Sequence, residues 1–333
     1  MEYNFHSINK VMIVAEIGNN HEGNVDVALH MIESAAKAGV DAVKFQTFIP
    51  ENYITRSDIA RLERLKRFKL SKDEYILLVN KAKNLGVIFF STPLDLESAS
   101  FLNDLQPIFK ISSGDNSFYP LIEKVASYKK PTIISTGLVN FSHLDALNAF
   151  WNKAGGTDEN LCFMHCVSSY PVPRNQANLR AISNLITKYP KLTIGYSDHT
   201  LGIQAPILAV AAGAKIIEKH FTLDKKYSDF RDHQLSADPQ EMTELVKKIH
   251  EVTELMGSGE KVKQPCEYEL EVSMRRSIAA SKDLLAGGAI TADDITWVRP
   301  GTGMPVGYED KVIGRKLALD LRHGDIIKDE DLL

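Results

Sequence analysis

The chain has 333 residues, of which 44% are hydrophobic and 25% charged, with a formal net charge of -4. This is the composition of a folded globular protein, with enough length for one large domain and a small one. The charge gives no basic surface of the kind that nucleic-acid binding needs, and the apolar runs are too short to cross a bilayer, so we expect a cytoplasmic protein acting on small molecules.

The three cysteines, Cys162, Cys166 and Cys266, form no metal-type pair in the sequence. An odd number of widely spaced cysteines favours a reducing compartment over a disulfide scaffold. We expect Cys162 and Cys166 only to pack, on one face of a strand.

From Val11 to about Leu255, short apolar runs alternate with helical patterns, which is typical of parallel strands covered by helices. Eight such runs occur, and these predict strands at Met12–Glu16, Ala42–Thr47, Val87–Thr92, Ile108–Ser113, Thr132–Thr136, Leu161–Val167, Leu192–Ser197 and Lys215–Phe221. Amphipathic segments such as 25–38, 72–85 and 201–212 lie between them. This count and size predict an α/β fold, a (β/α)8 TIM barrel over residues 1–256.

A polar stretch then interrupts the pattern, and we predict a linker over residues 257–274 and a small domain over residues 275–333. The small domain contains a repeat of the form D-L-x-x-G-x-x-I-x-x-x-D-[I/L], starting at Asp283 and again at Asp320. Two copies at the same spacing predict a pseudo-symmetric unit built from two similar turn-and-strand pieces.

In a TIM barrel the reacting groups lie at the carboxyl ends of the strands. Lys44 and Lys110 lie on otherwise apolar strands, where a buried ammonium group needs a partner. One interpretation is that each pairs with a barrel carboxylate such as Glu16 or Asp115. The other is that both bind a small dianionic substrate, together with the strand-end hydroxyls of Thr92, Ser113, Ser135 and Ser197.

His199 and His220 end consecutive strands, seven and eight. Two imidazoles at the barrel mouth could hold a metal ion, with water, substrate or Glu16 completing its shell, which favours exchangeable Mn2+ or Mg2+ over structural zinc. The alternative is that both histidines are simply hydrogen-bonded in the barrel. His21, His165 and His233 are weaker candidates.

At full length the chain resembles the sialic acid (N-acetylneuraminate) synthase family, a barrel joined to a small antifreeze-like (SAF) domain. The resemblance depends on ten motifs in order: AEIGNNHEG (15–23), VKFQT (43–47), STP (91–93), KISSGD (110–115), STG (135–137), HCVSSYP (165–171), GYSDHT (195–200), EKHF (218–221), RDH (231–233) and VRPG (298–301).

The resemblance implies roles for particular side chains. Phosphoenolpyruvate would be bound by Lys44, Thr92, Lys110, Ser113, Ser135 and Ser197, and Mn2+ or Mg2+ by His199 and His220. The acceptor sugar would contact Gln46, Tyr170, Asp232 and Arg299. It also implies a domain-swapped homodimer in which Arg299 acts on the barrel of the partner subunit.

The implied reaction joins phosphoenolpyruvate to an open-chain sugar aldehyde and releases phosphate by C–O cleavage, with Glu16 or Asp115 activating water. N-acetylmannosamine is the expected acceptor. The motif around Arg231 departs from the family pattern, and this leaves open a diacetamido sugar leading to legionaminic or pseudaminic acid, or an acceptor with an anionic group.

Two other interpretations remain. A Schiff-base aldolase of the same barrel class would use Lys44 or Lys110 as its nucleophile. A non-enzymatic glycan-binding protein would use the C-terminal repeat domain, but it would not need polar residues at nearly every strand end.

Overall fold

The computed structural model describes Phe5 and residues 10–333. The chain divides into two compact units, Met1–Gly257 and Ser258–Leu333. Within the described ranges, no helix is both long and apolar enough to span a membrane.

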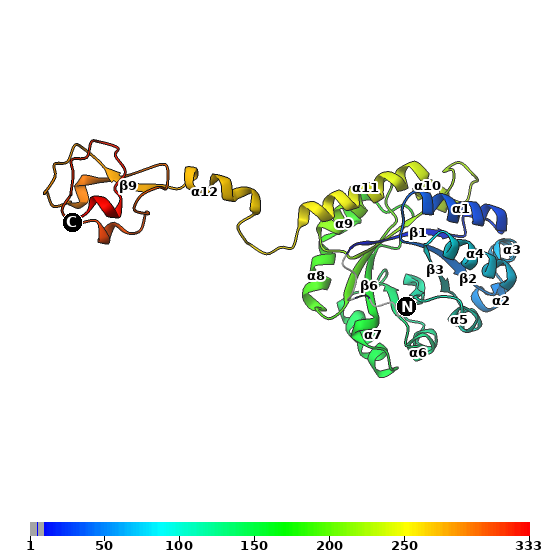
Figure 1. Cartoon of the computed structure of the whole chain (residues 1–333). Helices are drawn as coiled ribbons and strands as arrows, with labels where there is room; N and C mark the ends of the chain where they lie inside the picture. The colour runs from blue at the N-terminus through cyan, green and yellow to red at the C-terminus, as the bar shows by residue number, and fades with distance from the viewer. Residues whose placement is uncertain (1–4, 6–9) are drawn as a thin grey trace. The chain divides into compact units, whose positions relative to one another are not determined.

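The first unit is built on a parallel sheet, with eight strands in its described part, which confirms the predicted barrel class (Figure 1). The strand order is β3-β2-β1-β8-β7-β6-β5-β4, and β3 and β4, at its two ends, lie against each other. The strands are β1 (Met12–Gly18), β2 (Ala42–Thr47), β3 (Ile88–Pro93), β4 (Phe109–Ile111), β5 (Thr132–Ser135), β6 (Leu161–Cys166), β7 (Thr193–Asp198) and β8 (Ile216–His220).

Helices surround these strands, as Figure 1 shows. They are α1 (Val25–Lys37), α2 (Pro50–Tyr53), α3 (Ile59–Phe68), α4 (Lys72–Asn84), α5 (Leu96–Asn103), α6 (Tyr119–Ser127), α7 (Phe141–Lys153), α8 (Arg180–Lys188), α9 (Gln204–Ala211), α10 (Arg231–Leu235) and α11 (Pro239–Met256). The fourth strand is shorter than predicted because the chain turns into a 3-10 helix at Ser113–Asp115.

Side chains alternate along each strand, and this divides the apolar residues between a core under the helices and a core inside the barrel. In β1, Ile13, Ala15 and Ile17 pack against the helices, whereas Met12 and Val14 belong to the apolar cluster inside the barrel. Because side chains alternate with a period of two, Glu16 faces inward as well, one step closer to the carboxyl end. Polar groups therefore lie directly above an apolar layer.

Gly23, in the loop after β1, allows a close backbone approach to the end of α3. Its φ is +85°, and a Cβ at this position would lie 2.0 Å from the carbonyl oxygen of Arg67. Only glycine adopts this conformation without strain and leaves that space empty. The loop and α3 are thus held together at the carboxyl end of the barrel.

The second unit contains α12 (Tyr268–Met274) and an antiparallel pair, β9 (Ser277–Ala280) and β10 (Ile295–Val298). The segment 257–274, predicted as a linker, thus includes a helix. The second unit has an apolar cluster of its own, formed by residues such as Ile278, Ile290, Leu321 and Ile327.

The two sequence repeats form a pseudo-symmetric pair in this unit. Leu284 and Leu321 exchange backbone hydrogen bonds in both directions, at 2.7 and 2.9 Å. The carboxylate of Asp283 accepts from the His323 backbone at 2.9 Å, and that of Asp320 accepts from Ala286 at 2.7 Å. Each contact has its counterpart in the other copy, so the structure confirms the predicted repeat.

Candidate active site

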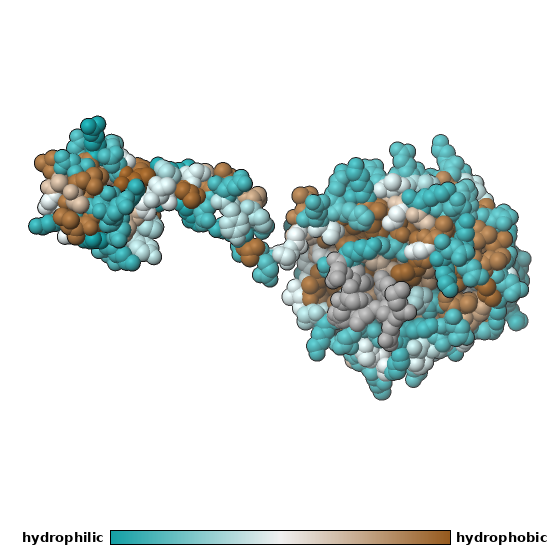
Figure 2. Space-filling model, viewed as in Figure 1, coloured by the Kyte–Doolittle hydropathy of each residue, from teal (hydrophilic) through white to brown (hydrophobic). Residues whose placement is uncertain are grey.

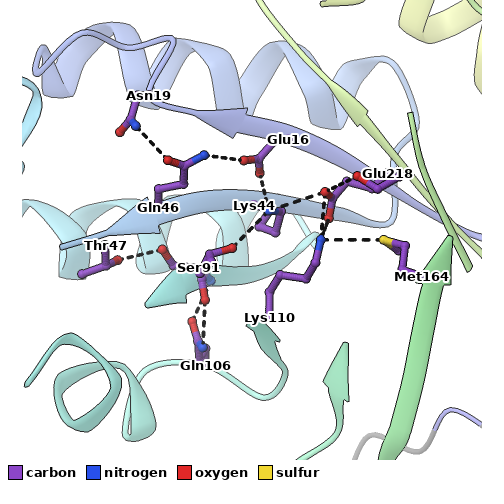
Figure 3. Close-up of polar contacts among 12 residues, drawn as sticks. Glu16, Asn19, Lys44, Gln46, Thr47, Ser91, Gln106, Lys110, Met164 and Glu218 are labelled. Atoms are coloured by element: carbon purple, nitrogen blue, oxygen red, sulfur yellow. Dashed lines mark hydrogen bonds and ion pairs between the residues drawn. The ribbon is translucent and has the colours of Figure 1, made fainter. Parts of the chain in front are cut away.

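Four buried charged side chains form the base of a cavity at the carboxyl end of the barrel (Figure 3). Lys110 Nζ lies 2.7 and 2.9 Å from the two carboxylate oxygens of Glu218. Lys44 Nζ lies 3.0 Å from Glu16 Oε2 and 3.6 Å from Glu218 Oε1. Both lysines thus pair with barrel carboxylates, as one interpretation of the sequence held, but Glu218 was not named there as a partner.

Neutral polar groups complete the hydrogen bonding of this charged cluster. Lys44 donates to Thr92 Oγ1 at 3.1 Å, and Ser197 donates to Glu218 at 2.9 Å. Gln46 donates to Glu16 at 3.2 Å and accepts from Asn19 at 2.8 Å. Figure 3 shows Gln46 lying between Asn19 and Glu16. Such bonds lower the cost of keeping charges away from water.

The four groups differ in how firmly they hold their charge. Burial, reinforced by the negative charge of Glu218, raises the pKa of Glu16 to about 7 although Lys44 opposes the shift. Burial also favours neutral Glu218, but the ammonium groups of Lys110 and Lys44 outweigh it and hold the pKa of Glu218 well below its ordinary value. Glu16 is therefore the carboxylate that can exchange a proton near neutral pH.

The pKa values of the two lysines shift in opposite directions. Burial lowers the pKa of Lys110, and the neighbouring Lys44 adds to this, against the attraction of Glu218. Burial acts on Lys44 too, but the two carboxylates beside it raise its pKa. Both ammonium groups are held by ion pairs, a state that suits anion binding better than nucleophilic attack.

The predicted strand-end hydroxyls line the same cavity, including Ser113 and Ser135. Ser113 Oγ accepts from the backbone of Gly137 at 3.1 Å. A Cβ on Gly137 would lie 2.7 Å from that oxygen, so any larger residue would displace the Ser113 hydroxyl. The hydroxyls and the two lysines thus converge on one site.

His199 and His220 also line the cavity, with ring centroids 5.4 Å apart. His199 Nδ1 lies 2.9 Å from the carbonyl oxygen of Val167, which places the proton on Nδ1 and leaves Nε2 with a free lone pair. His220 Nδ1 is buried and has no hydrogen-bond partner among the described residues. Burial and the nearby His199 hold the pKa of His220 well below its ordinary value.

The donors available there fit a metal ion held by two protein ligands. In the part of the chain that the structure describes, no group of three or more histidine, cysteine or acidic side chains could hold a metal. Burial lowers the pKa of His199, but its contact with Cys166 outweighs burial and raises the pKa, so His199 must lose a proton to bind a metal. Two imidazoles with oxygen ligands from water or substrate suit Mn2+ or Mg2+ better than structural zinc, which takes four protein ligands.

Aromatic and sulfur groups surround the histidines. The Tyr170 ring lies 4.1 Å from that of His199, and Arg231 Cζ lies 4.7 Å from the centre of the Tyr170 ring. Cys166, expected only to pack, lines the cavity with its Sγ 3.8 Å from His199 Nδ1. Asp232, beside Arg231, lines the cavity as well.

Two predicted site residues need separate comment: Asp115 does not line the cavity, and Arg299 belongs to the other unit. Of the described residues, those lining the cavity do not include Asp115, whose carboxylate accepts from Ser112 at 2.6 Å. Arg299 is an exposed residue of the second unit, directly after β10. Its predicted contact with the sugar stays a prediction.

Sequence reasoning missed Glu218, although the signal was present. In β8 the neighbouring Lys219 faces away from the cavity and pairs with Asp198 at 2.7 Å. Alternation then places both Glu218 and His220 inside the barrel. The motif EKHF therefore carries two inward polar residues, not one.

Because Glu218 neutralises Lys110 in a buried site, we expect Glu218→Gln to lower the free energy of unfolding by about 3–5 kcal/mol. Chemical denaturation of the purified protein measures this. The matched control is Glu251→Gln, which breaks the exposed pair of Glu251 with Lys248. This substitution should leave the free energy of unfolding nearly unchanged. Equal effects of the two substitutions would contradict the importance of the buried pair.

Comparisons with known proteins agree with this geometry. The NeuB family model matches residues 31–261, and the SAF domain model matches residues 275–333. The N,N'-diacetyllegionaminic acid synthase of Campylobacter jejuni is 36% identical over 96% of this chain and 99% of its own length. The N-acetylneuraminate-9-phosphate synthase of Mus musculus is 34% identical over 96% of this chain and 92% of its own length.

A solved structure is also similar. The N-acetylneuraminic acid synthetase of Leptospira borgpetersenii, determined with citrate, matches with a TM-score of 0.75 and 36% identity, over 78% of this chain and 90% of that one. The agreement covers both the barrel and the C-terminal unit through the two family models. The chain therefore belongs to the NeuB family and is a sialic acid synthase-like enzyme with a C-terminal SAF domain.

Proposed function

We propose that this enzyme condenses phosphoenolpyruvate with an open-chain amino sugar, giving a nonulosonic acid and phosphate. The observation that carries the proposal is the pair of buried lysines, surrounded by hydroxyls, below two free imidazole nitrogens in one cavity. Lys44 and Lys110 supply the positive charge that the carboxylate and phosphate of phosphoenolpyruvate require. Thr92, Ser113, Ser135 and Ser197 supply hydrogen bonds.

In the proposed reaction the methylene carbon of phosphoenolpyruvate forms a bond to the aldehyde carbon of the sugar. Water then adds to the resulting cationic carbon, and the C–O bond to phosphate breaks. Glu16 lies at the cavity base with a pKa of about 7, so its ionised form can take the proton from water. We choose Glu16 over Asp115 because Glu16 lines the cavity.

His199 and His220 are the residues that would hold Mn2+ or Mg2+. The ion would act as a Lewis acid on the aldehyde oxygen. The orphaned Nδ1 of buried His220 and the free Nε2 of His199 support this assignment.

Gln46, Tyr170 and Asp232 line the cavity and are our candidates for binding the acceptor sugar. N-acetylmannosamine, free or phosphorylated, is the first choice. A diacetamido sugar is the second, because the Campylobacter relative is named as a diacetyllegionaminic acid synthase. Arg231 lies over the Tyr170 ring, so its charge borders the acceptor site.

We further propose a homodimer in which Arg299 completes the partner's site. Tyr268, Leu270, Val272 and Met274 on α12 are exposed, an unusual run of apolar side chains for a solvated helix. Figure 2 shows apolar residues, in brown, on the visible faces of both units. Burial of α12 by a second copy would account for this run.

The central experiment measures phosphate release from phosphoenolpyruvate with N-acetylmannosamine, its 6-phosphate, mannose and a diacetamido sugar, with and without Mn2+. We expect release with at least one amino sugar, and loss of that activity on chelation. Phosphoenolpyruvate labelled with 18O in its bridging oxygen should give labelled phosphate, as C–O cleavage requires. Trapping of a pyruvate–lysine adduct by borohydride, without phosphate release, would support the aldolase instead.

The pH dependence tests the role of Glu16. A general base acts when ionised, so we expect kcat/KM to rise with pH through a midpoint near 7, the pKa of Glu16. Glu16→Gln should lose most activity, and its residual rate should lack this step. The substrates ionise in the same way with both proteins. If the kcat/KM of Glu16→Gln still rises through the same pH midpoint, the titrating group is not Glu16.

Mixing two inactive variants tests the shared site. Glu16→Gln and Arg299→Ala homodimers should each be impaired, and subunit exchange should restore activity, because one site of the mixed dimer then has both residues. If Arg299 acted on its own barrel, both sites of the mixed dimer would stay defective. A Glu16→Gln protein mixed with itself is the control, and size-exclusion chromatography confirms the dimer.

A further inference from the structure

Three arginines of α3 line the outer part of the cavity: Arg61, Arg64 and Arg67. Their spacing of three residues places them along one side of the helix, over a rise of about 9 Å. Leu62, Leu65 and Phe68 are buried and form the adjoining side of the helix, which anchors it. The helix is thus fixed to the barrel by its apolar residues while its arginines face the opening.

The side of α3 that carries Arg61, Arg64 and Arg67, here called the arginine face, has no direct acidic partner among the described residues. Among the described residues, none of the three arginines forms an ion pair, although Arg61 donates to the hydroxyl of Tyr53 at 3.3 Å. Of three carboxylates that line this part of the cavity, Glu22 contacts Ser228 and His233, and Asp232 pairs with Arg231. The third, Asp229, forms no ion pair with a described residue, so three arginines share the opening with one uncommitted carboxylate. The lysines at the base, in contrast, are neutralised.

Position distinguishes the arginine face from the phosphoenolpyruvate site. Lys44 and Lys110 are buried, whereas Arg61, Arg64 and Arg67 are exposed at the cavity opening. The proposed aldehyde carbon must reach phosphoenolpyruvate at the base, so the far end of the acceptor extends toward the opening. A cavity of about 890 Å³ holds both substrates in this order.

We propose that the arginine face binds a phosphate monoester on the end of the acceptor sugar remote from its aldehyde. The inference rests on the proposed function and specifies its acceptor class, a phosphorylated amino sugar. The planar guanidinium group forms paired hydrogen bonds with phosphate oxygens, and several such groups on one helix face match a dianionic ester. Arg64 is central in the row, and its guanidinium forms no hydrogen bond, ion pair or cation–π contact with a described residue, unlike Arg61, which contacts Tyr53, and Arg67, which lies over Phe68.

A different role for the same charge would be to attract phosphoenolpyruvate from solution. That role would affect the use of phosphoenolpyruvate with every acceptor alike. Direct binding of an acceptor phosphate changes only the preference between phosphorylated and unphosphorylated sugars. The ratio of the two kcat/KM values therefore separates the alternatives.

The test compares N-acetylmannosamine 6-phosphate with N-acetylmannosamine in the wild-type enzyme, Arg64→Gln and Lys66→Gln. Lys66 lies on the same helix, does not line the cavity within the described chain, and pairs with Glu63, so its substitution is a matched loss of charge. We expect the wild type to prefer the phosphorylated sugar at least tenfold. Arg64→Gln should reduce this ratio about tenfold or more, the worth of a charge-assisted hydrogen bond, and Lys66→Gln should keep it.

Efficient use of N-acetylmannosamine or a diacetamido sugar without preference for the phosphorylated form would overturn this inference and leave the proposed function intact. So would a rise in the KM for phosphoenolpyruvate in Arg64→Gln with an unchanged acceptor ratio. No phosphate release with any acceptor would overturn both.

Discussion

The cost of burying charge is the constraint on which this site depends. Two lysines and two glutamates lie inside the barrel above an apolar layer, where each unpaired charge would cost several kcal/mol. Their mutual pairing makes the cluster neutral before substrate arrives. Of the four groups, Glu16, with a pKa of about 7, is the one whose charge can change near neutral pH.

The distribution of charge along the cavity gives it a direction. The base is neutral overall and tightly hydrogen-bonded, the middle contains two imidazoles beside Tyr170, and the opening carries arginines without acidic partners. The base and the opening of the cavity present different chemical groups, so the two proposed substrates would each bind at a particular end. The strands and their carboxyl ends supply the base and the two imidazoles, whereas the segment after β6 supplies Tyr170 and helix α3 supplies the arginines.

Much of this could be predicted from the sequence, because strand alternation and strand-end polar residues are local signals. Lys44, His199 and His220 were placed in one site on that basis, and the structure brings them together. The partner of Lys110 could not be predicted, because Glu218 is 108 residues away and the pairing depends on how the barrel closes. The position of Asp115 depends on a local feature that strand alternation does not predict: a 3-10 turn directs its carboxylate to Ser112.

The exchanged contacts give the C-terminal unit an internal two-fold symmetry. Asp283 accepts from the backbone of the second copy and Asp320 from that of the first, so each half fixes a turn of the other. These contacts are exposed, and water could replace them in a lone half. The apolar cluster could not be replaced in this way, because it joins equivalent residues of the two copies, such as Ile290 and Ile327, so neither half has a core of its own.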